Sequence, residues 1–265
     1  MQAFACDLDG TLVGRNGLLG PRTLSAIARS KDEGVRVLVA TGRMFRSARR
    51  YLDEAGLDDP VVCYQGAAVV DPRSGEFLLH EPLDLGVARE VIESLGARGL
   101  SPNVYVDDQL YVARETEYSR RYSAFQHLPV VEVGDLLAWL DRPPTKLVVV
   151  SEPEVLADVR GELAPRFDGR LFLTTSLPYM LELGNPGVTK GSGLAFVASA
   201  LGIELDRVVA FGDGENDVEL LEVAGFGVAV EGGHPRLLAI ADRTCPGPED
   251  EGVAAVMEAV LDSSS

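Results

Sequence analysis

Two short motifs rich in aspartate and glycine lie near opposite ends of this 265-residue chain. The first spans Asp7–Thr11 (DLDGT), and the second spans Gly212–Asp217 (GDGEND). At average residue usage, each pattern occurs by chance in roughly a few chains per thousand of this length. Carboxylates are ligands that Mg²⁺ prefers, and protein-bound Mg²⁺ commonly takes phosphate oxygens as well. The two motifs therefore predict metal-assisted phosphoryl chemistry.

The charges of these motifs point the same way. If Asp7, Asp9, Asp213 and Asp217 meet, four negative charges lie within a few ångströms, and some must stay protonated through raised pKa values. A divalent cation together with Lys190 reduces the net charge of the set to −1, which a site can tolerate. Taken singly, Lys190 is typical of a solvated lysine, although a cation at a helix N-terminus opposes the helix dipole.

Short apolar runs alternate with helical patterns in the first part of the chain. The patterns predict strands at Ala3–Cys6, Val35–Ala40 and Val61–Tyr64, separated by helices at Thr23–Glu33 and Ser47–Ala55. Strands that are apolar on both faces are typical of a buried parallel sheet. Ligands of such sheets bind beyond the carboxyl ends of the strands, which is where the aspartate motifs occur.

The pattern changes after residue 82. A helix at Leu85–Arg98 precedes two alternating strands, Asn103–Val106 and Leu110–Ala113, with three turn residues (107–109) between them. Parallel α/β units do not use such a hairpin, so it indicates a mixed α+β region. The alternation of strands and helices resumes after Asn185–Gly187. We therefore expect an α/β domain in two pieces, residues 1–82 and 186–265, with an α+β domain inserted at residues 83–185.

Composition limits the partners and the location. Lys and Arg number 24 and Asp and Glu 41, a net charge of −17, so neither nucleic acid nor an anionic membrane is an expected partner. No apolar run approaches the roughly 18 residues of a spanning helix, and the N-terminus has no basic leader. The three cysteines, Cys6, Cys63 and Cys245, are few and widely separated, which fits a reducing cytoplasm.

Four motifs together carry a family resemblance. Asp7–Thr11, Ala40–Arg43, Gly187–Gly191 and Gly212–Asp217 resemble the four motifs of the haloacid dehalogenase-like (HAD) hydrolases. The α+β insertion between the second and third motifs resembles the cap of the Cof-type subfamily, IIB. The resemblance implies a Rossmann-like core that performs the chemistry and a cap that closes over the leaving group and selects the substrate.

The resemblance also implies roles for individual residues. Asp7 would be the nucleophile that forms an aspartyl-phosphate, and Asp9 the general acid and base. Mg²⁺ would be held by Asp7, the backbone carbonyl of Asp9 and Asp213, with Asp217 in or near that shell. The phosphate- or substrate-binding set would comprise Gly10, Thr41, Gly42, Arg43, Lys190 and Asn216. Thr41 taken singly is typical of a helix N-cap.

The chain departs from the family pattern in several places. Gln65 stands where the subfamily usually has asparagine, and the segment Glu231–His234 replaces a Gly-Asn-Ala sequence. Since the Gln65 loop faces the cap in the family, this departure concerns substrate preference rather than the chemistry.

The expected function is a Mg²⁺-dependent phosphatase of small phosphorylated metabolites, with sugar phosphates favoured by the resemblance. Flavin mononucleotide, pyridoxal phosphate and mannosyl-3-phosphoglycerate are alternative substrates, and the oligomeric state is undetermined. A phosphomutase of the phosphomannomutase type is one rival. A regulator that binds metal or phosphate is another, although such a binder needs no general acid. Residues of the insertion that could touch the leaving group are Tyr105, Tyr111, Arg114 and Tyr179, whereas Arg120 and Arg121 are typical of a solvated helix face.

Overall fold

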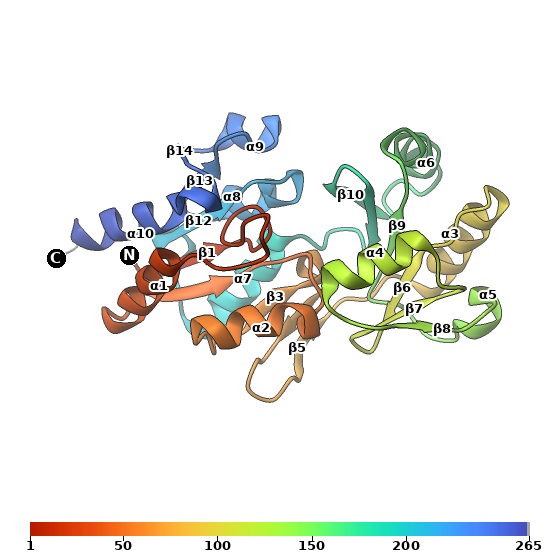
Figure 1. Cartoon of the computed structure of the whole chain (residues 1–265), viewed down its shortest axis with the longest axis horizontal. Coiled ribbons are helices and arrows are strands. Elements are labelled where there is room, and N and C mark those ends of the chain that lie inside the picture. Colours follow the sequence, from red (N-terminus) through yellow and green to blue (C-terminus); the bar gives the residue numbers. More distant parts are fainter. Residues whose placement is uncertain (264–265) are drawn as a thin grey trace. The chain divides into compact units, whose positions relative to one another are not determined.

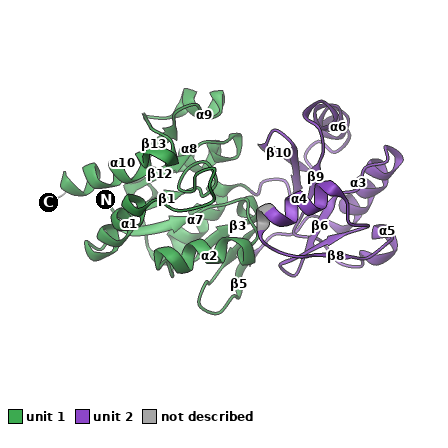
Figure 2. Cartoon of the chain, viewed as in Figure 1, with its two compact units in different colours: residues 1–79, 189–265 green, residues 80–188 purple. Residues whose placement is uncertain are grey.

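A computed structural model of the chain describes residues 1–263, apart from the side chains of residues 125, 126 and 176. The chain forms two compact units (Figure 2). Unit 1 comprises residues 1–79 and 189–265, and unit 2 comprises residues 80–188.

Unit 1 is built on a parallel five-stranded sheet with the order β14-β13-β12-β1-β2 (Figure 1). Its strands are β1 (Ala3–Cys6), β2 (Arg36–Val39), β12 (Val208–Gly212), β13 (Phe226–Val230) and β14 (Arg243–Cys245). Every residue of β1 and β12 is buried, as expected for central strands covered on both faces. A bridge between Ala40 and Val62 extends the sheet toward a smaller one, which contains β3 (Val61–Cys63), β4 (Ala68–Val70) and β5 (Phe77–His80).

Helices cover both faces of the parallel sheet. Ala3 and Ala5 of β1 belong to a hydrophobic cluster with residues of α7, α8 and α9. Because strand residues alternate in direction, Phe4 and Cys6 point to the opposite face. The helices α1 and α10 contact each other and complete the unit together with α2. The bounds of the helices are α1 (Pro21–Asp32), α2 (Phe45–Ala55), α7 (Lys190–Leu201), α8 (Val218–Val223), α9 (Pro235–Ile240) and α10 (Gly252–Asp262).

Helix starts differ from the sequence prediction by about a turn or less. α1 begins at Pro21 rather than Thr23, because proline suits the first position of a helix, where its missing N–H is not needed. α2 begins at Phe45 rather than Ser47. Four 3₁₀ turns join elements of this unit, at Tyr64–Gly66, Leu205–Arg207, Glu215–Asp217 and Pro248–Asp250.

Unit 2 is an α+β fold with a six-stranded sheet of order β10-β11-β9-β6-β7-β8. The pairs are antiparallel except β7 with β8, which is parallel. A hydrophobic cluster unites one face of the sheet with α3, α5 and α6, while α4 contacts β8 and β9. The strands are β6 (Asn103–Val106), β7 (Gln109–Val112), β8 (Val130–Glu132), β9 (Lys146–Val150), β10 (Phe172–Leu177) and β11 (Met180–Gly184). The helices are α3 (Leu85–Ala97), α4 (Glu117–Gln126), α5 (Leu136–Trp139) and α6 (Pro153–Arg166).

The predicted hairpin of unit 2 exists, but its turn is one residue shorter than the sequence analysis expects. Val106 pairs with Gln109, so β7 begins at Gln109 and the turn consists of Asp107 and Asp108. Both aspartates adopt left-handed conformations, with φ of 51° and 54°. Two left-handed residues match the twist of a two-residue hairpin, and aspartate tolerates this conformation better than most residues.

The predicted fold class is confirmed: an α/β core with a parallel sheet is interrupted by an α+β insertion. Among the described residues, no helix combines the length and apolar character needed to cross a membrane.

Candidate active site

The parallel sheet of unit 1 brings the two aspartate motifs to one edge. Cys6, the last residue of β1, pairs in register with Phe211 of β12, and the Asp7 N–H donates to the Phe211 carbonyl at 3.0 Å. Both strands end within a residue of this pair, so Asp7 and Asp213 leave the sheet side by side.

Three carboxylates gather at this edge. Asp7, Asp213 and Asp217 each offer an oxygen within 4.8 Å of the others. Asp7 and Asp217 are buried, and the Thr11 hydroxyl donates to Asp213 Oδ1 at 3.2 Å. The carboxylate of Asp9 lies outside this cluster. The arrangement is an all-oxygen donor set of the kind that Mg²⁺ prefers.

Lys190 lies between two of these carboxylates. It is the first residue of α7, which Thr189 caps through a capping box with Ser192. The Lys190 Nζ donates to Asp7 Oδ1 and to Asp217 Oδ1, each at 2.6 Å, and the side chain is fully buried. Burial alone would lower the pKa of Lys190, but the Asp217 and Asp7 carboxylates outweigh burial and raise it. Lys190 therefore stays charged.

The carboxylates themselves have raised pKa values. Burial raises the pKa of Asp7 well above its ordinary value; Lys190 opposes this effect, and the neighbouring aspartates add to it. Burial and Asp217 likewise raise the pKa of Asp213 to about 7, against the opposing effects of Lys190 and Thr11. Without a cation, protons must neutralise part of this cluster.

Arg43 holds the second aspartate of the first motif. Its Nε donates to Asp9 Oδ2 and its Nη2 to Asp9 Oδ1, both at 2.7 Å, while its Nη1 donates to Ser47 at 2.8 Å. The Arg43 N–H donates to Thr41 Oγ1 at 3.1 Å. The structure thus places the guanidinium of Arg43, expected at the phosphate or substrate, on Asp9 in a bidentate ion pair.

Counting Arg43 changes the charge of the predicted site. The four aspartates carry −4, Lys190 and Arg43 contribute +2, and one divalent cation brings the set to zero. The side chains present therefore fit Mg²⁺ in both donor type and charge. Asp7, Asp213 and Asp217 are the side chains that could hold it.

Asp217 organises the loop of its motif. Its Oδ2 accepts the N–H groups of Asp213 at 3.0 Å and Gly214 at 2.9 Å, while Oδ1 accepts Lys190. A side chain at Gly212 would place its Cβ 2.4 Å from the Asp217 Cβ. Asp217 therefore positions both the Asp213 backbone and the lysine, besides offering an oxygen to the cluster.

The loop after β3 contributes a side chain that the sequence analysis connects with substrate preference and not with the chemistry. Gln65 has a left-handed backbone, with φ of 61°, and its Oε1 accepts a hydrogen bond from Asn216 Nδ2 at 3.0 Å. A Cβ atom added at Gly42 would lie only 2.3 Å from the side-chain nitrogen Nε2 of Gln65. Asn216 and Gly42, both expected at the phosphate, therefore each lie against Gln65.

Close backbone approaches hold Asp213 in place. A Cβ at Gly10, where φ is +86°, would lie 2.3 Å from Asp213 Oδ2. The His234 N–H donates to the Asp213 carbonyl at 2.7 Å, and a Cβ at Gly233 would lie 2.7 Å from the same oxygen. The unusual Glu231–His234 segment thus supports the Asp213 backbone.

Thr11, Ser47, Gln65 and His234 are the site residues that the sequence analysis misses. Thr11 lies inside the first motif, so its place there was a usable signal. Ser47 lies one helical turn after Arg43, but nothing in its sequence neighbourhood shows that the guanidinium turns back to it. Gln65 and His234 were visible as departures from a pattern, and their contacts depend on loops far away in the chain.

Three comparisons with known proteins identify the family of this chain. The family model described as haloacid dehalogenase-like hydrolase matches residues 4–257. The 5-amino-6-(5-phospho-D-ribitylamino)uracil phosphatase of Bacillus subtilis is 31% identical, over 95% of this chain and 94% of its own.

Solved structures share the fold. A haloacid dehalogenase-like hydrolase from Bacteroides thetaiotaomicron superposes with a TM-score of 0.88 and 25% identity, covering 98% of this chain and 99% of its own. A HAD subclass IIB sugar phosphatase superposes with a TM-score of 0.85 and 20% identity, covering 98% and 99%. The chain therefore belongs to the haloacid dehalogenase-like hydrolases, as the four motifs predict, and is an enzyme of the hydrolase class.

Proposed function

We propose that this chain is a Mg²⁺-dependent phosphatase of small phosphorylated metabolites, with Asp7 as the nucleophile. The observation that supports it most is the Asp7 carboxylate, buried among Asp213, Asp217 and Lys190 at the end of a parallel strand. A carboxylate held beside a cation and further oxygen ligands suits attack on a phosphoryl group. A cytoplasmic location belongs to the same proposal and suits the three buried thiols.

The proposed reaction has two steps. An Asp7 oxygen bonds to phosphorus while the bond from phosphorus to the substrate oxygen breaks, and Asp9 gives its proton to that leaving oxygen. Asp9 then takes a proton from water, whose oxygen bonds to phosphorus as the bond to Asp7 breaks. Inorganic phosphate and the dephosphorylated alcohol are the products.

Asp7, Asp213, Asp217 and the backbone carbonyl of Asp9 would hold Mg²⁺, which when bound neutralises the phosphoryl oxygens and orients them for in-line attack. Lys190 stays charged and compensates the Asp7 and Asp217 carboxylates throughout. Thr41, Gly42 and Asn216 belong to the proposed phosphate-binding loops.

Asp9 needs a carboxylate oxygen for each proton transfer, and both of its oxygens accept hydrogen bonds from Arg43. At least one of these bonds must open during catalysis. We assign Arg43 to positioning Asp9, whose side chain is 31% exposed and thus accessible to substrate.

The leaving group has two candidate classes. The Bacillus relative is named for a ribityl phosphate attached to a uracil ring, whereas the subclass IIB neighbour is titled a sugar phosphatase. The sequence analysis favours sugar phosphates. Unit 2 is the proposed substrate-selecting cap.

The test is phosphate release from a panel of sugar, nucleotide and cofactor monophosphates, with Mg²⁺ and with chelator. Asp7→Asn is the matched control, since it keeps the shape and removes the anionic nucleophile. We expect release that requires Mg²⁺ and vanishes in the variant, together with a labelled aspartyl-phosphate trapped on the wild type. Release that survives in Asp7→Asn would overturn the proposal. Turnover that appears only as transfer to a second sugar oxygen, with a bisphosphorylated sugar added, would indicate the phosphomutase.

A further inference from the structure

The helix α1 begins without a cap of its own. Its N-cap residue is Gly20, which has no side chain to accept a hydrogen bond, and its first turn contains no acidic residue. A side chain at the N-cap position usually accepts one of the first N–H groups of a helix, and a negative charge there also suits the helix dipole. In this chain the acceptor comes from a distant segment.

Glu251 supplies this cap from the other end of the sequence. Its Oε2 accepts the Thr23 N–H at 2.6 Å, although 228 positions separate the two residues. A Cβ atom added at Gly20 would lie 2.2 Å from the same oxygen, so the missing side chain leaves room for the carboxylate. Glu251 has a left-handed backbone, with φ of 51°. A non-glycine residue keeps such a conformation only where the surrounding structure fixes it.

The loop before α1 connects the capped helix to the first aspartate motif. Leu19, directly before the N-cap, forms an antiparallel bridge with Val13, and Val13 forms a parallel bridge with Asp9. The Gly10 N–H also donates to the Val13 carbonyl at 3.0 Å. Val13 and Leu19 are buried, so these bridges lie in the interior of unit 1. Two successive bridges therefore join the start of α1 to the backbone of Asp9.

Two further contacts hold the same loop. Glu249 Oε1 accepts the Arg15 N–H at 3.0 Å. The Tyr51 hydroxyl of α2 donates to the Gly17 carbonyl at 3.3 Å, and the Arg43 guanidinium carbon lies 5.3 Å from the centroid of the Tyr51 ring. The loop thus contacts the ring that lies beneath Arg43, the ion-pair partner of Asp9.

We propose that Glu251 is a positioning residue for the phosphatase reaction: its cap on α1 fixes the loop whose bridges set the backbone position of Asp9. The Asp9 carboxyl must lie within hydrogen-bond distance of the leaving oxygen to protonate it. A misplacement of about 1 Å can slow such a step about 100-fold. The inference rests on the proposed function, because the proton transfer by Asp9 belongs to that proposal.

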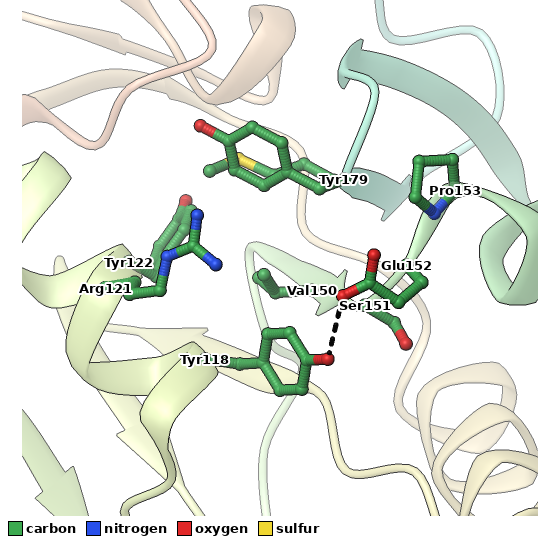
Figure 3. A pocket seen from close by; sticks show the side chains of 9 residues that line it. Tyr118, Arg121, Tyr122, Val150, Ser151, Glu152, Pro153 and Tyr179 are labelled. Carbon is green, nitrogen blue, oxygen red and sulfur yellow. Dashed lines mark hydrogen bonds between the residues drawn. The ribbon is translucent and has the colours of Figure 1, made fainter.

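The effect concerns proton transfer and not the recognition of the leaving group. A cavity of about 280 Å³ in unit 2 is lined by residues of that unit, among them Tyr118, whose hydroxyl donates to Glu152 (Figure 3). Glu251 and the loop before α1 belong to unit 1. A difference between substrates in a Glu251 variant is therefore expected to follow the need of the leaving group for a proton.

The experiment compares an alkyl phosphate with p-nitrophenyl phosphate, in the full chain with Mg²⁺. The alkyl probe is whichever of glucose 6-phosphate, pyridoxal 5′-phosphate and 5-amino-6-(5-phospho-D-ribitylamino)uracil the wild type hydrolyses fastest. An alkoxide is strongly basic and needs a proton as it leaves, whereas p-nitrophenolate is a weak base and leaves without one. The measured quantity is kcat/KM, which covers the steps up to the first phosphoryl transfer.

We expect Glu251→Ala to lower kcat/KM about tenfold for the alkyl phosphate and to change it less than about threefold for p-nitrophenyl phosphate. Glu251→Gln keeps an oxygen acceptor and should retain most of the activity on both. Glu258→Ala is the matched control, since Glu258 also joins α10 to α1 but pairs with the Arg22 guanidinium. Both kcat/KM values of this control should match those of the wild type.

Gly20→Ala tests the inference without changing Glu251, and it decides the matter if Glu251→Ala does not fold. Alanine suits the φ of −72° at this position, but its Cβ would displace the Glu251 carboxylate, so the same selective loss is expected. An equal fall for both kinds of substrate, or no fall for either, would overturn the inference while phosphatase activity persists. If the wild type hydrolyses none of the alkyl phosphates, the proposed function fails instead.

Discussion

Lys190→Met removes the cation that joins Asp7 to Asp217 and keeps the length of the side chain. Since the lysine is fully buried and bonds both carboxylates at 2.6 Å, its loss leaves buried negative charge without compensation. Removing one partner of a buried ion pair costs about 3–5 kcal/mol. For a chain of this size that corresponds to a fall of about 6–20 °C in the unfolding midpoint.

The pH dependence of this loss follows from the pKa of Asp7. Burial already raises that pKa and Lys190 opposes the rise, so the variant raises it further. Above the ordinary aspartate pKa of about 4, the folded variant must retain a proton that the unfolded chain releases. Its stability therefore falls as the pH rises, and over a wider pH range than in the wild type, so the deficit should be larger at pH 8 than at pH 5.

Thermal unfolding of metal-free protein at pH 5 and pH 8, with and without Mg²⁺, measures these effects. Mg²⁺ should raise the midpoint of Lys190→Met more than that of the wild type, because it supplies the missing positive charge. Lys146→Met is the matched control: Lys146 is also buried and paired, but with Glu182 in unit 2, outside the acidic cluster. If Mg²⁺ fails to raise the Lys190→Met midpoint, or raises the Lys146→Met midpoint as much, the electrostatic reasoning is wrong.

Three further predictions concern the same unit. Because the pKa of Asp213 in the folded protein is about 7, the metal-free wild type should lose stability between pH 4 and pH 7, as measured by calorimetry. Mg²⁺ should stabilise the wild type more at pH 8 than at pH 5, and an equal gain at both pH values would contradict this. Gly66→Ala should cost more than 2 kcal/mol in denaturant unfolding, since its Cβ would lie 2.0 Å from a backbone oxygen, whereas Gly34→Ala, in open space at φ +76°, should cost about 1 kcal/mol. Arg43→Met should lower kcat about 10- to 100-fold, whereas Arg43→Lys should retain part of the activity. Arg49 is exposed, so Arg49→Met should leave kcat unchanged. If kcat is unchanged in Arg43→Met, Arg43 does not position Asp9.

Strand and motif positions were predictable because they depend on local patterns. Continuous apolar runs such as Ala3–Cys6 are typical of strands buried on both faces of a parallel sheet, and the carboxyl ends of parallel strands lie at one edge. Because both residues follow strands of this kind, Asp7 and Asp213 are expected at the same edge of the sheet, although they lie 206 positions apart in the sequence. The insertion was likewise visible as a change from parallel to hairpin patterns.

Turn lengths and side-chain partners were not predictable in the same way. The turn at Asp107 and Asp108 is shorter than expected because two aspartates adopt left-handed conformations, which composition permits but does not require. Tyr105 and Tyr111, candidates for substrate contact, pack inside unit 2 instead: Tyr105 is fully buried and Tyr111 lies against Trp139.

The sequence by itself determined the family, the fold class and the residue types at the end of each parallel strand, since these follow from periodicity and from motifs too specific to arise by chance. Tertiary structure alone decided which polar side chains pair. Arg43 reaches back across 34 residues to Asp9, and Asn216 meets Gln65 across 151. Such contacts depend on the directions in which separate loops leave the sheet, and a hydrogen bond tolerates errors of only a few tenths of an ångström. Local sequence preferences do not specify loop geometry to that accuracy.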